Sequence, residues 1–285
     1  MQTMSFPLLH FDLNKIALSG QVFRWEMLGP SFWLMQSGEY AATARQAENT
    51  LFLTCPASQL PFWKRYLTPD EDYDGFWACI GRHVATDGEE AYLSRAARAG
   101  DGIRILRQEL FETAVSFLIS QNNNIPRIRK ILSNLCRTLG QPLSPEQSPM
   151  KRQLYAFPSP EALCDTARLR SLGLGYRDRY VAQTASHFAQ DCAAWESLRE
   201  ADCEEARARL LTLPGVGPKV ADCILLFGLC KLEAFPRDVW IRRVLAREFP
   251  QGFPYERYPG FSGFVQQLIY FFEREQQGSL HQKGG

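Results

Sequence analysis

Residues 211–223 read Leu-Thr-Leu-Pro-Gly-Val-Gly-Pro-Lys-Val-Ala-Asp-Cys, and this stretch decides the fold that the sequence predicts. It lies between two segments with helical spacing of apolar residues. Gly215 and Gly217 allow positive φ angles and a close backbone approach, and Pro218 suits the first turn of a helix. A lone Gly-x-Gly is typical of a plain corner between helices, whereas the full pattern predicts a helix-hairpin-helix over residues 206–229. Free N–H groups at the start of its second helix favour a phosphate, and we expect the phosphate-binding hairpin to comprise Leu213, Gly215, Val216 and Gly217.

The rest of the chain divides into two regions of different periodicity. Residues from about 6 to 56 show alternating side chains and regularly spaced turn residues, which predicts short antiparallel strands. Helix-like segments follow near 60–66 and 75–84, and from residue 103 onward apolar residues recur at helical spacing. We therefore expect an α+β fold, with an N-terminal antiparallel β domain over 1–100 and a helical region over 101–285.

The helical region contains several predicted interruptions. Five prolines mark residues 141–160 as a connection, with at most a short helix near 151–156. Shorter breaks are expected at 173–175, 214–217 and 235–238. We expect the last helix to cover about 262–275 and the Gln/Gly-rich tail after it to be frayed.

Composition excludes several classes of protein. Of the 285 residues 45% are hydrophobic and 22% are charged, so the chain can bury a core and is not globally disordered. It has no apolar run long enough for a transmembrane helix, and its start lacks the pattern of a secretory signal. The eight cysteines form no C-x-x-C pair, which fits a reducing compartment. Because the net charge is only +1, any basic patch for nucleic acid must be local and built by folding.

A family resemblance emerges from two stretches together. Residues 211–223 are followed by Phe-Pro-Arg-Asp-Val-Trp at 235–240, and the pair resembles the DNA glycosylases that combine a helix-hairpin-helix with a Gly/Pro loop and an aspartate. Among these, the chain is most similar to the 8-oxoguanine DNA glycosylases, over roughly residues 7–275. The resemblance implies an N-terminal antiparallel β domain and two helical domains that flank a DNA-binding cleft.

Two residues are candidates for catalysis. Lys219 opens the second helix of the hairpin, where a lysine that only holds a phosphate is the simpler interpretation. The resemblance implies that it attacks C1′ of the deoxyribose and forms a Schiff base. Asp238 precedes a helical run, so it is expected to be an N-cap. By resemblance it is also the carboxylate that stabilises the sugar cation, and the helix dipole makes both roles compatible.

Four residues are implied to recognise the base. Cys223 lies four residues after Lys219, on the same helix face, where a buried structural thiol is the alternative; nearness to the amine would favour a thiolate–ammonium pair. Gly20 matches a glycine whose carbonyl accepts the N7–H of the oxidised base, although it could be an ordinary strand-entry glycine. Gln266 is implied to bind the Watson–Crick edge, and Tyr270, on the same helix face, to stack opposite Cys223.

Four further residues are implied to insert into the duplex and contact the opposite base. Asn122, in the triplet 122–124, would fill the gap left by the extruded nucleotide, and Tyr176 would wedge into the stack. Arg127 and Arg177 would hold the orphaned cytosine, whose O2 and N3 accept hydrogen bonds. The chain departs from the family at Trp240, where a histidine near the phosphate is more familiar.

The predicted function is excision of 8-oxoguanine opposite cytosine, followed by strand cleavage through β-elimination. The alternatives are a water-using glycosylase for alkylated bases, which generally lacks the hairpin lysine, and a non-catalytic helix-hairpin-helix protein. We expect no required cofactor and no transition-metal site, although the hairpin carbonyls could bind a monovalent cation. The expected partner is duplex DNA, with no membrane association. We expect a monomer in the cytoplasm or nucleoid of a bacterium, or in the nucleus of a eukaryote.

Overall fold

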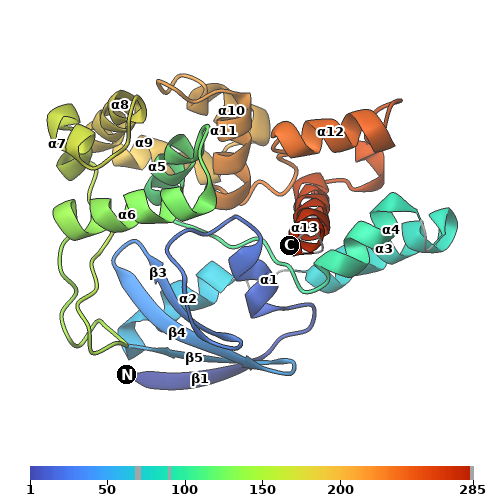
Figure 1. Ribbon diagram of the computed structural model, residues 1–285, viewed down its shortest axis with the longest axis horizontal. Coiled ribbons are helices and arrows are strands. Elements are labelled where there is room, and N and C mark those ends of the chain that lie inside the picture. Colours follow the sequence, from blue (N-terminus) through green and yellow to red (C-terminus); the bar gives the residue numbers. More distant parts are fainter. Residues whose placement is uncertain (68–71, 89–90, 283–285) are drawn as a thin grey trace.

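A five-stranded antiparallel sheet is formed between Gln2 and Cys55 (Figure 1). The computed structural model describes residues 1–67, 72–88 and 91–282. The strand order is β1-β5-β4-β3-β2, and the alternating burial of β5 is what a strand with one covered face requires. The strands are β1 (Gln2–Pro7), β2 (Glu26–Gly29), β3 (Phe32–Ser37), β4 (Tyr40–Ala47) and β5 (Thr50–Cys55).

Each face of the sheet has its own cover. On one face, Trp33 and Leu53 pack with Ile16 of α1 (Leu13–Leu18) and Trp63 of α2 (Leu60–Leu67). On the other face, Leu34 and Ala41 pack against Leu143, Leu154 and Ala156, which belong to the proline-rich connection.

The connection at 141–160 therefore covers the sheet instead of only linking helices. It has no helix near 151–156, where a short one was predicted. Instead Leu143 N–H donates to the carbonyl of Leu154 at 2.9 Å, and Pro142 forms a strand-like bridge with Tyr155. Extended backbone suits this segment because proline lacks the N–H that a helix uses.

The remaining helices share one large core, built around the buried helix α5. Figure 1 shows this helical region beside the sheet, with α6 nearest the strands. The helices of more than one turn are α3 (Tyr73–Asp87), α4 (Tyr92–Gly100), α5 (Leu110–Ser120), α6 (Ile125–Leu139), α7 (Thr166–Ser171), α8 (Arg177–Gln190), α9 (Cys192–Glu196), α10 (Cys203–Leu210), α11 (Pro218–Cys223), α12 (Val239–Glu248) and α13 (Ser262–Gln282).

The predicted fold class is confirmed, because an antiparallel sheet is followed by helices alone. The predicted breaks at 173–175, 214–217 and 235–238 all interrupt helices. Two boundaries differ from the prediction: β1 starts at Gln2, and α13 continues to Gln282 where a frayed tail was expected. A π-helical turn, Ile224–Gly228, follows α11 directly.

A buried ion pair joins the two regions. Arg24, which follows α1, donates to Glu112 of α5 at 2.9 Å, and their side chains are only 7% and 12% exposed. Arg24 also donates to the carbonyls of Gly38 and Tyr155. The sheet, the connection and α5 are thereby held in one arrangement.

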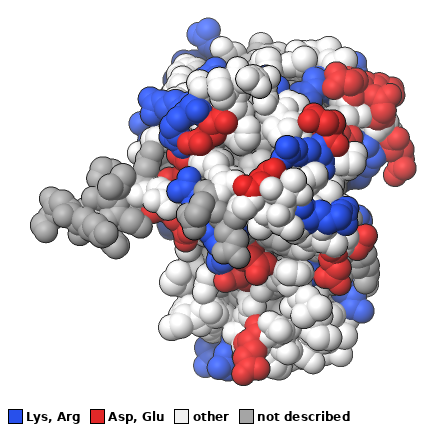
Figure 2. Space-filling view, turned by 90° about the vertical axis from the view of Figure 1, so that its right-hand side faces the viewer, with Lys and Arg blue, Asp and Glu red and all other residues white. Residues whose placement is uncertain are grey.

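The charged residues on the surface are of both signs, in line with the net charge of +1. Figure 2 shows Lys and Arg interspersed with Asp and Glu on one face of the molecule. Within the described ranges, no helix is both long enough and apolar enough to cross a membrane.

Candidate active site

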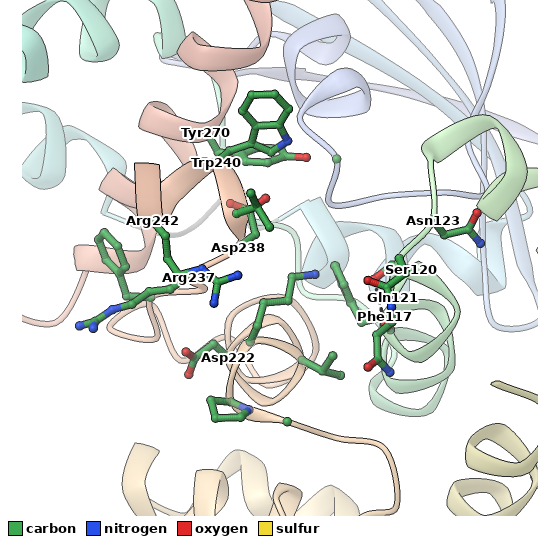
Figure 3. A pocket seen from close by; sticks show the side chains of 18 of the residues that line it. Phe117, Ser120, Gln121, Asn123, Asp222, Arg237, Asp238, Trp240, Arg242 and Tyr270 are labelled. Carbon is green, nitrogen blue, oxygen red and sulfur yellow. Dashed lines mark hydrogen bonds between the residues drawn. The ribbon is translucent and has the colours of Figure 1, made fainter. Parts of the chain in front are cut away.

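Lys219 lies in the wall of a large open cavity between the hairpin, α5 and α13. The cavity has a volume of about 950 Å³ and is lined by Gly217 and Pro218 of the hairpin region and by Asp238. The Lys219 Nζ lies 5.3 Å from the centre of the Phe117 ring, so the half-buried amine faces an aromatic surface. Figure 3 shows Asp238 and Tyr270 on one side of this pocket and Phe117, Ser120 and Gln121 on the other.

Asp238 has the predicted N-cap geometry. Its carboxylate accepts a hydrogen bond from the backbone N–H of Ile241 at 2.8 Å, which fixes the side chain at the start of α12. The same side chain lines the cavity together with Lys219. Capping and a role in the cavity are therefore compatible, as the sequence predicts.

The six candidates for catalysis and base recognition line a second, smaller cavity. Its volume is about 50 Å³, room for water but not for a purine. The Tyr270 ring lies against Gly20, because a Cβ placed on Gly20 would lie 3.1 Å from this ring. The cavity must therefore widen before a base can enter. The six candidates are Gly20, Lys219, Cys223, Asp238, Gln266 and Tyr270.

Gln266 is the member of this group most clearly prepared for a ligand. Its side chain is 3% exposed, and its Oε1 is buried without a hydrogen-bond partner in the described part of the chain. A buried carbonyl oxygen without a donor costs about 1–3 kcal/mol. A ligand N–H placed in this cavity would remove that cost.

The expected thiolate–ammonium pair is subject to opposing effects. Cys223 is buried, and burial raises the pKa of its thiol more than the nearby Lys219 charge lowers it. Burial therefore opposes the thiolate, while the Lys219 charge and a side-chain hydrogen bond to Lys219 favour it, and the thiolate–ammonium pair stays a prediction. Burial likewise raises the pKa of Tyr270.

The predicted wedge residues meet at the edge of the cavity. Asn122 Nδ2 donates to the hydroxyl of Tyr176 at 3.0 Å, and Tyr176 is 51% exposed. Asn122 has a φ of 48°, a left-handed conformation that asparagine tolerates better than most residues. Arg127 is exposed in the first turn of α6, close in sequence to this tip.

Arg177 lies beneath the wedge and not on its surface. It is 5% exposed and donates to the carbonyls of Gln121, Asn122 and Leu174. Its guanidinium therefore joins the asparagine loop to the loop before α8. The prediction of a cytosine contact did not anticipate this structural role.

The hairpin is held by its apolar side chains, which leaves backbone at the surface. Leu213 and Val216 are buried, whereas Gly215 has a φ of 79°. A Cβ on Gly215 would lie 2.4 Å from the ring of Tyr180. Gly217 caps α11 without a side-chain hydrogen bond, so N–H groups of the first turn stay available.

Sequence reasoning missed the aromatic wall of the cavity. The Phe117 ring faces the Lys219 amine and stacks on the Phe227 ring, with ring centres 5.4 Å apart. Phe23 forms another part of the lining. Phe117 lies in the last turn of α5, shortly before the asparagine triplet at 122–124, and this position in the sequence could have identified it.

Comparison with known proteins identifies relatives that share this architecture. Residues 3–114 match the family model described as 8-oxoguanine DNA glycosylase, N-terminal domain. A solved structure of MBOgg1 in complex with a low affinity DNA ligand is 30% identical, with a TM-score of 0.85, over 97% of this chain and 100% of that chain. The chain belongs to the 8-oxoguanine DNA glycosylase family.

Two further relatives extend the comparison. The 8-oxoguanine glycosylase/lyase of Clostridium acetobutylicum, solved with DNA containing cytosine opposite 8-oxoguanine, is 26% identical, with a TM-score of 0.83, over 97% of this chain and 99% of that one. The N-glycosylase/DNA lyase OGG1 of Arabidopsis thaliana is 32% identical over 78% of this chain and 62% of its own length. The matched segments span 42 to 62% of the curated relatives that are at least 30% identical.

Proposed function

We propose that this family member is a bifunctional DNA glycosylase and AP lyase that excises 8-oxoguanine opposite cytosine from duplex DNA. The observation that carries the proposal is that Lys219 and Asp238 share one small cavity with Gln266, whose carbonyl oxygen has no hydrogen-bond partner within the described ranges. An amine, a fixed carboxylate and a base-reading amide are the groups that such a reaction requires.

In this mechanism the protein first holds the distorted duplex. Backbone N–H groups of the hairpin bind a phosphate, and Tyr176 wedges into the stack. Asn122 fills the space of the extruded nucleotide, while Arg127 and the remaining donor capacity of Arg177 hold the cytosine. Extrusion of the base costs a few kcal/mol.

Base reading depends on a proton that guanine lacks. The Gly20 carbonyl accepts the N7–H of 8-oxoguanine, whereas guanine presents a lone pair at N7. Gln266 binds the Watson–Crick edge, and Tyr270 and Cys223 enclose the two faces of the base.

The chemical steps follow from the amine. The Lys219 Nζ attacks C1′, the N-glycosidic bond breaks, and the base leaves with its electron pair and takes up a proton. The attached amine gives up one proton, its lone pair forms the C1′=N bond as the C1′–O4′ bond breaks, and O4′ takes up the second amine proton, which leaves an open-chain imine. Loss of a C2′ proton then expels the 3′ phosphate. The Asp238 carboxylate stabilises the positive charge that develops on the sugar.

Borohydride trapping tests this proposal. With duplex containing 8-oxoguanine, the protein is expected to form a covalent adduct, and Lys219→Gln is expected to abolish both the adduct and turnover while lesion binding stays measurable. Base release without an adduct would favour the water-using glycosylase. Tight binding with no base release would favour the non-catalytic alternative.

The remaining features of the proposal concern its setting. The protein works as a monomer without a required cofactor or transition metal, and the hairpin carbonyls could hold a monovalent cation. It acts where the DNA is, in the nucleoid or cytoplasm of a bacterium or in a eukaryotic nucleus. Light scattering would test the monomer, and activity after treatment with a chelator would test the independence from metals.

A further inference from the structure

A second groove runs along α6, between this helix and the edge strand of the sheet. Its volume is about 640 Å³. Phe23 lines both this groove and the large cavity, so the two spaces are neighbours. The α6 wall is one helix face, because its residues are spaced i, i+4, i+7 and i+8: Arg129, Ser133, Cys136 and Arg137.

Helix α6 concentrates positive charge in a protein that is otherwise nearly neutral. It carries four cations and no carboxylate: Arg127, Arg129, Lys130 and Arg137. The opposite wall of the groove contributes Arg24 and Arg152, which are paired with Glu112 and Glu26. In the described ranges, Arg129 and Arg137 have no such carboxylate partner.

Arg129 carries a specific sign of an absent anion. Its Nε is buried and has no hydrogen-bond partner among the described residues. Burial, together with the like charge of nearby Arg274, lowers the pKa of this guanidinium. A phosphate oxygen beside Arg129 would accept the unused hydrogen bond and reduce the repulsion between the two arginines.

We propose that this groove binds backbone phosphates of the DNA duplex beyond the lesion, on the side of the cavity away from the hairpin. Arg129 and Arg137 are eight residues apart, about 12 Å along the helix, which spans several successive phosphates of one strand at a rise of about 3.4 Å. The inference rests on the proposed function for the identity of the polyanion.

Continuity with the active site favours DNA over other anions. A duplex held at the hairpin and opened in the cavity must continue past α6 or past the sheet. A groove that shares Phe23 with the cavity and has two arginines without a carboxylate partner among the described residues offers such a path. Free phosphate and an acidic protein segment are the other ligands of the same chemistry.

The experiment measures affinity for lesion-containing and undamaged duplexes across a salt series. Each phosphate contact contributes about 0.9 to the slope of log K against log salt. We expect Arg129→Gln and Arg137→Gln each to lower the slope by about 0.9, and the double variant by about 1.8. Arg129→Lys should keep most of the slope, since it preserves the charge. The matched control, Arg82→Gln, removes an exposed arginine of α3 and should change nothing.

Two further arms separate the outcomes. The duplex extends from the lesion in two arms, and the proposal places one of them along the α6 groove. Shortening that arm should remove the effect of the α6 variants on the salt slope, and shortening the other arm should not. A thermal shift with inorganic phosphate that depends on Arg129 and Arg137, alongside unchanged DNA slopes, would assign the groove to free phosphate and overturn the proposal.

The inference and the proposed function fail in different ways. If the exposed variant Arg137→Gln, which should not disturb folding, and Arg129→Gln both leave the slope unchanged, the groove does not bind DNA. An acidic protein segment would then be the remaining candidate ligand of the groove. If the wild-type protein releases no base while the slopes change as expected, the groove stands and the catalytic proposal falls.

Discussion

Asp238 combines a structural and a chemical role in one carboxylate. We expect Asp238→Asn to keep the cap on α12 and to lose the charge. Base release should then fall on the order of 100-fold or more with little change in stability. Asp238→Ala should lose both, with unfolding free energy lower by about 1 kcal/mol. Single-turnover rates and urea unfolding measure the two effects, and an Asn variant with wild-type rates would refute the chemical role.

Cys223 is expected to be poorly reactive in the free protein. Because burial raises its pKa, the thiolate fraction should become appreciable only at a higher pH than for an ordinary cysteine. Alkylation at a series of pH values from about 7 to about 10, followed by mass spectrometry, measures the reactivity of Cys223. The exposed Cys164 is the internal reference. Equal labelling of the two cysteines at pH 7 would show that Cys223 is an accessible thiolate after all.

At the scale of elements, Gly215 links the hairpin to the wedge. Its Cβ-free backbone accommodates the ring of Tyr180, which in turn contacts Tyr176 edge to face with ring centres 6.2 Å apart. Gly215→Ala should be destabilising, because it adds left-handed strain of about 1–2 kcal/mol to the clash with the ring. In a double-mutant cycle, adding Tyr180→Ala should restore the unfolding free energy that is lost to the clash but not the part that is lost to backbone strain. If the effects of the two substitutions on the unfolding free energy simply add, the contact between residue 215 and the Tyr180 ring is refuted.

Short-range chemistry made some elements predictable and left others hidden. The hairpin and the Asp238 cap depend on residues within a few positions, so the sequence alone predicts them. The pairing of β1 with β5 joins Gln2 to Cys55, and no local pattern specifies it. The connection at 141–160 became strand-like because the open face of the sheet needed apolar cover. The contacts of Arg177 with the carbonyls of Gln121 and Asn122 were not predictable, because those residues lie on another loop.

The candidate site shows the same division. Residue types and spacing indicated the hairpin with Lys219 at its start, the Asp238 cap and the helix face that Lys219 shares with Cys223. Only the family resemblance indicated their roles in catalysis and base recognition, and it alone indicated Gly20. Neither source indicated that the Gln266 oxygen has no hydrogen-bond partner in the described part of the chain, that Tyr270 lies against Gly20, or that arginines line the α6 groove. Each of these depends on which distant segments meet in space.

For the whole molecule, the Arg24–Glu112 pair should strongly influence stability. Glu112→Leu would leave a buried guanidinium without its anion and should cost about 3–5 kcal/mol. Adding Arg24→Met removes that unpaired charge, so the double variant should be more stable than Glu112→Leu alone. Urea unfolding of the three variants measures this. A double variant that is less stable than the single one would show that the other hydrogen bonds of Arg24 matter more than the charge pair.

The pocket for the base is completed by residues from opposite ends of the sequence. Gly20 and Gln266 are 246 positions apart (266 − 20), while Lys219 and Asp238 lie between them. During synthesis, Gly20 and Lys219 leave the ribosome well before Gln266 and Tyr270. A chain that has not yet reached α13, or a protease fragment that ends after α12, therefore lacks the Gln266 amide and the Tyr270 ring. The small cavity can close only after the last helix has been made.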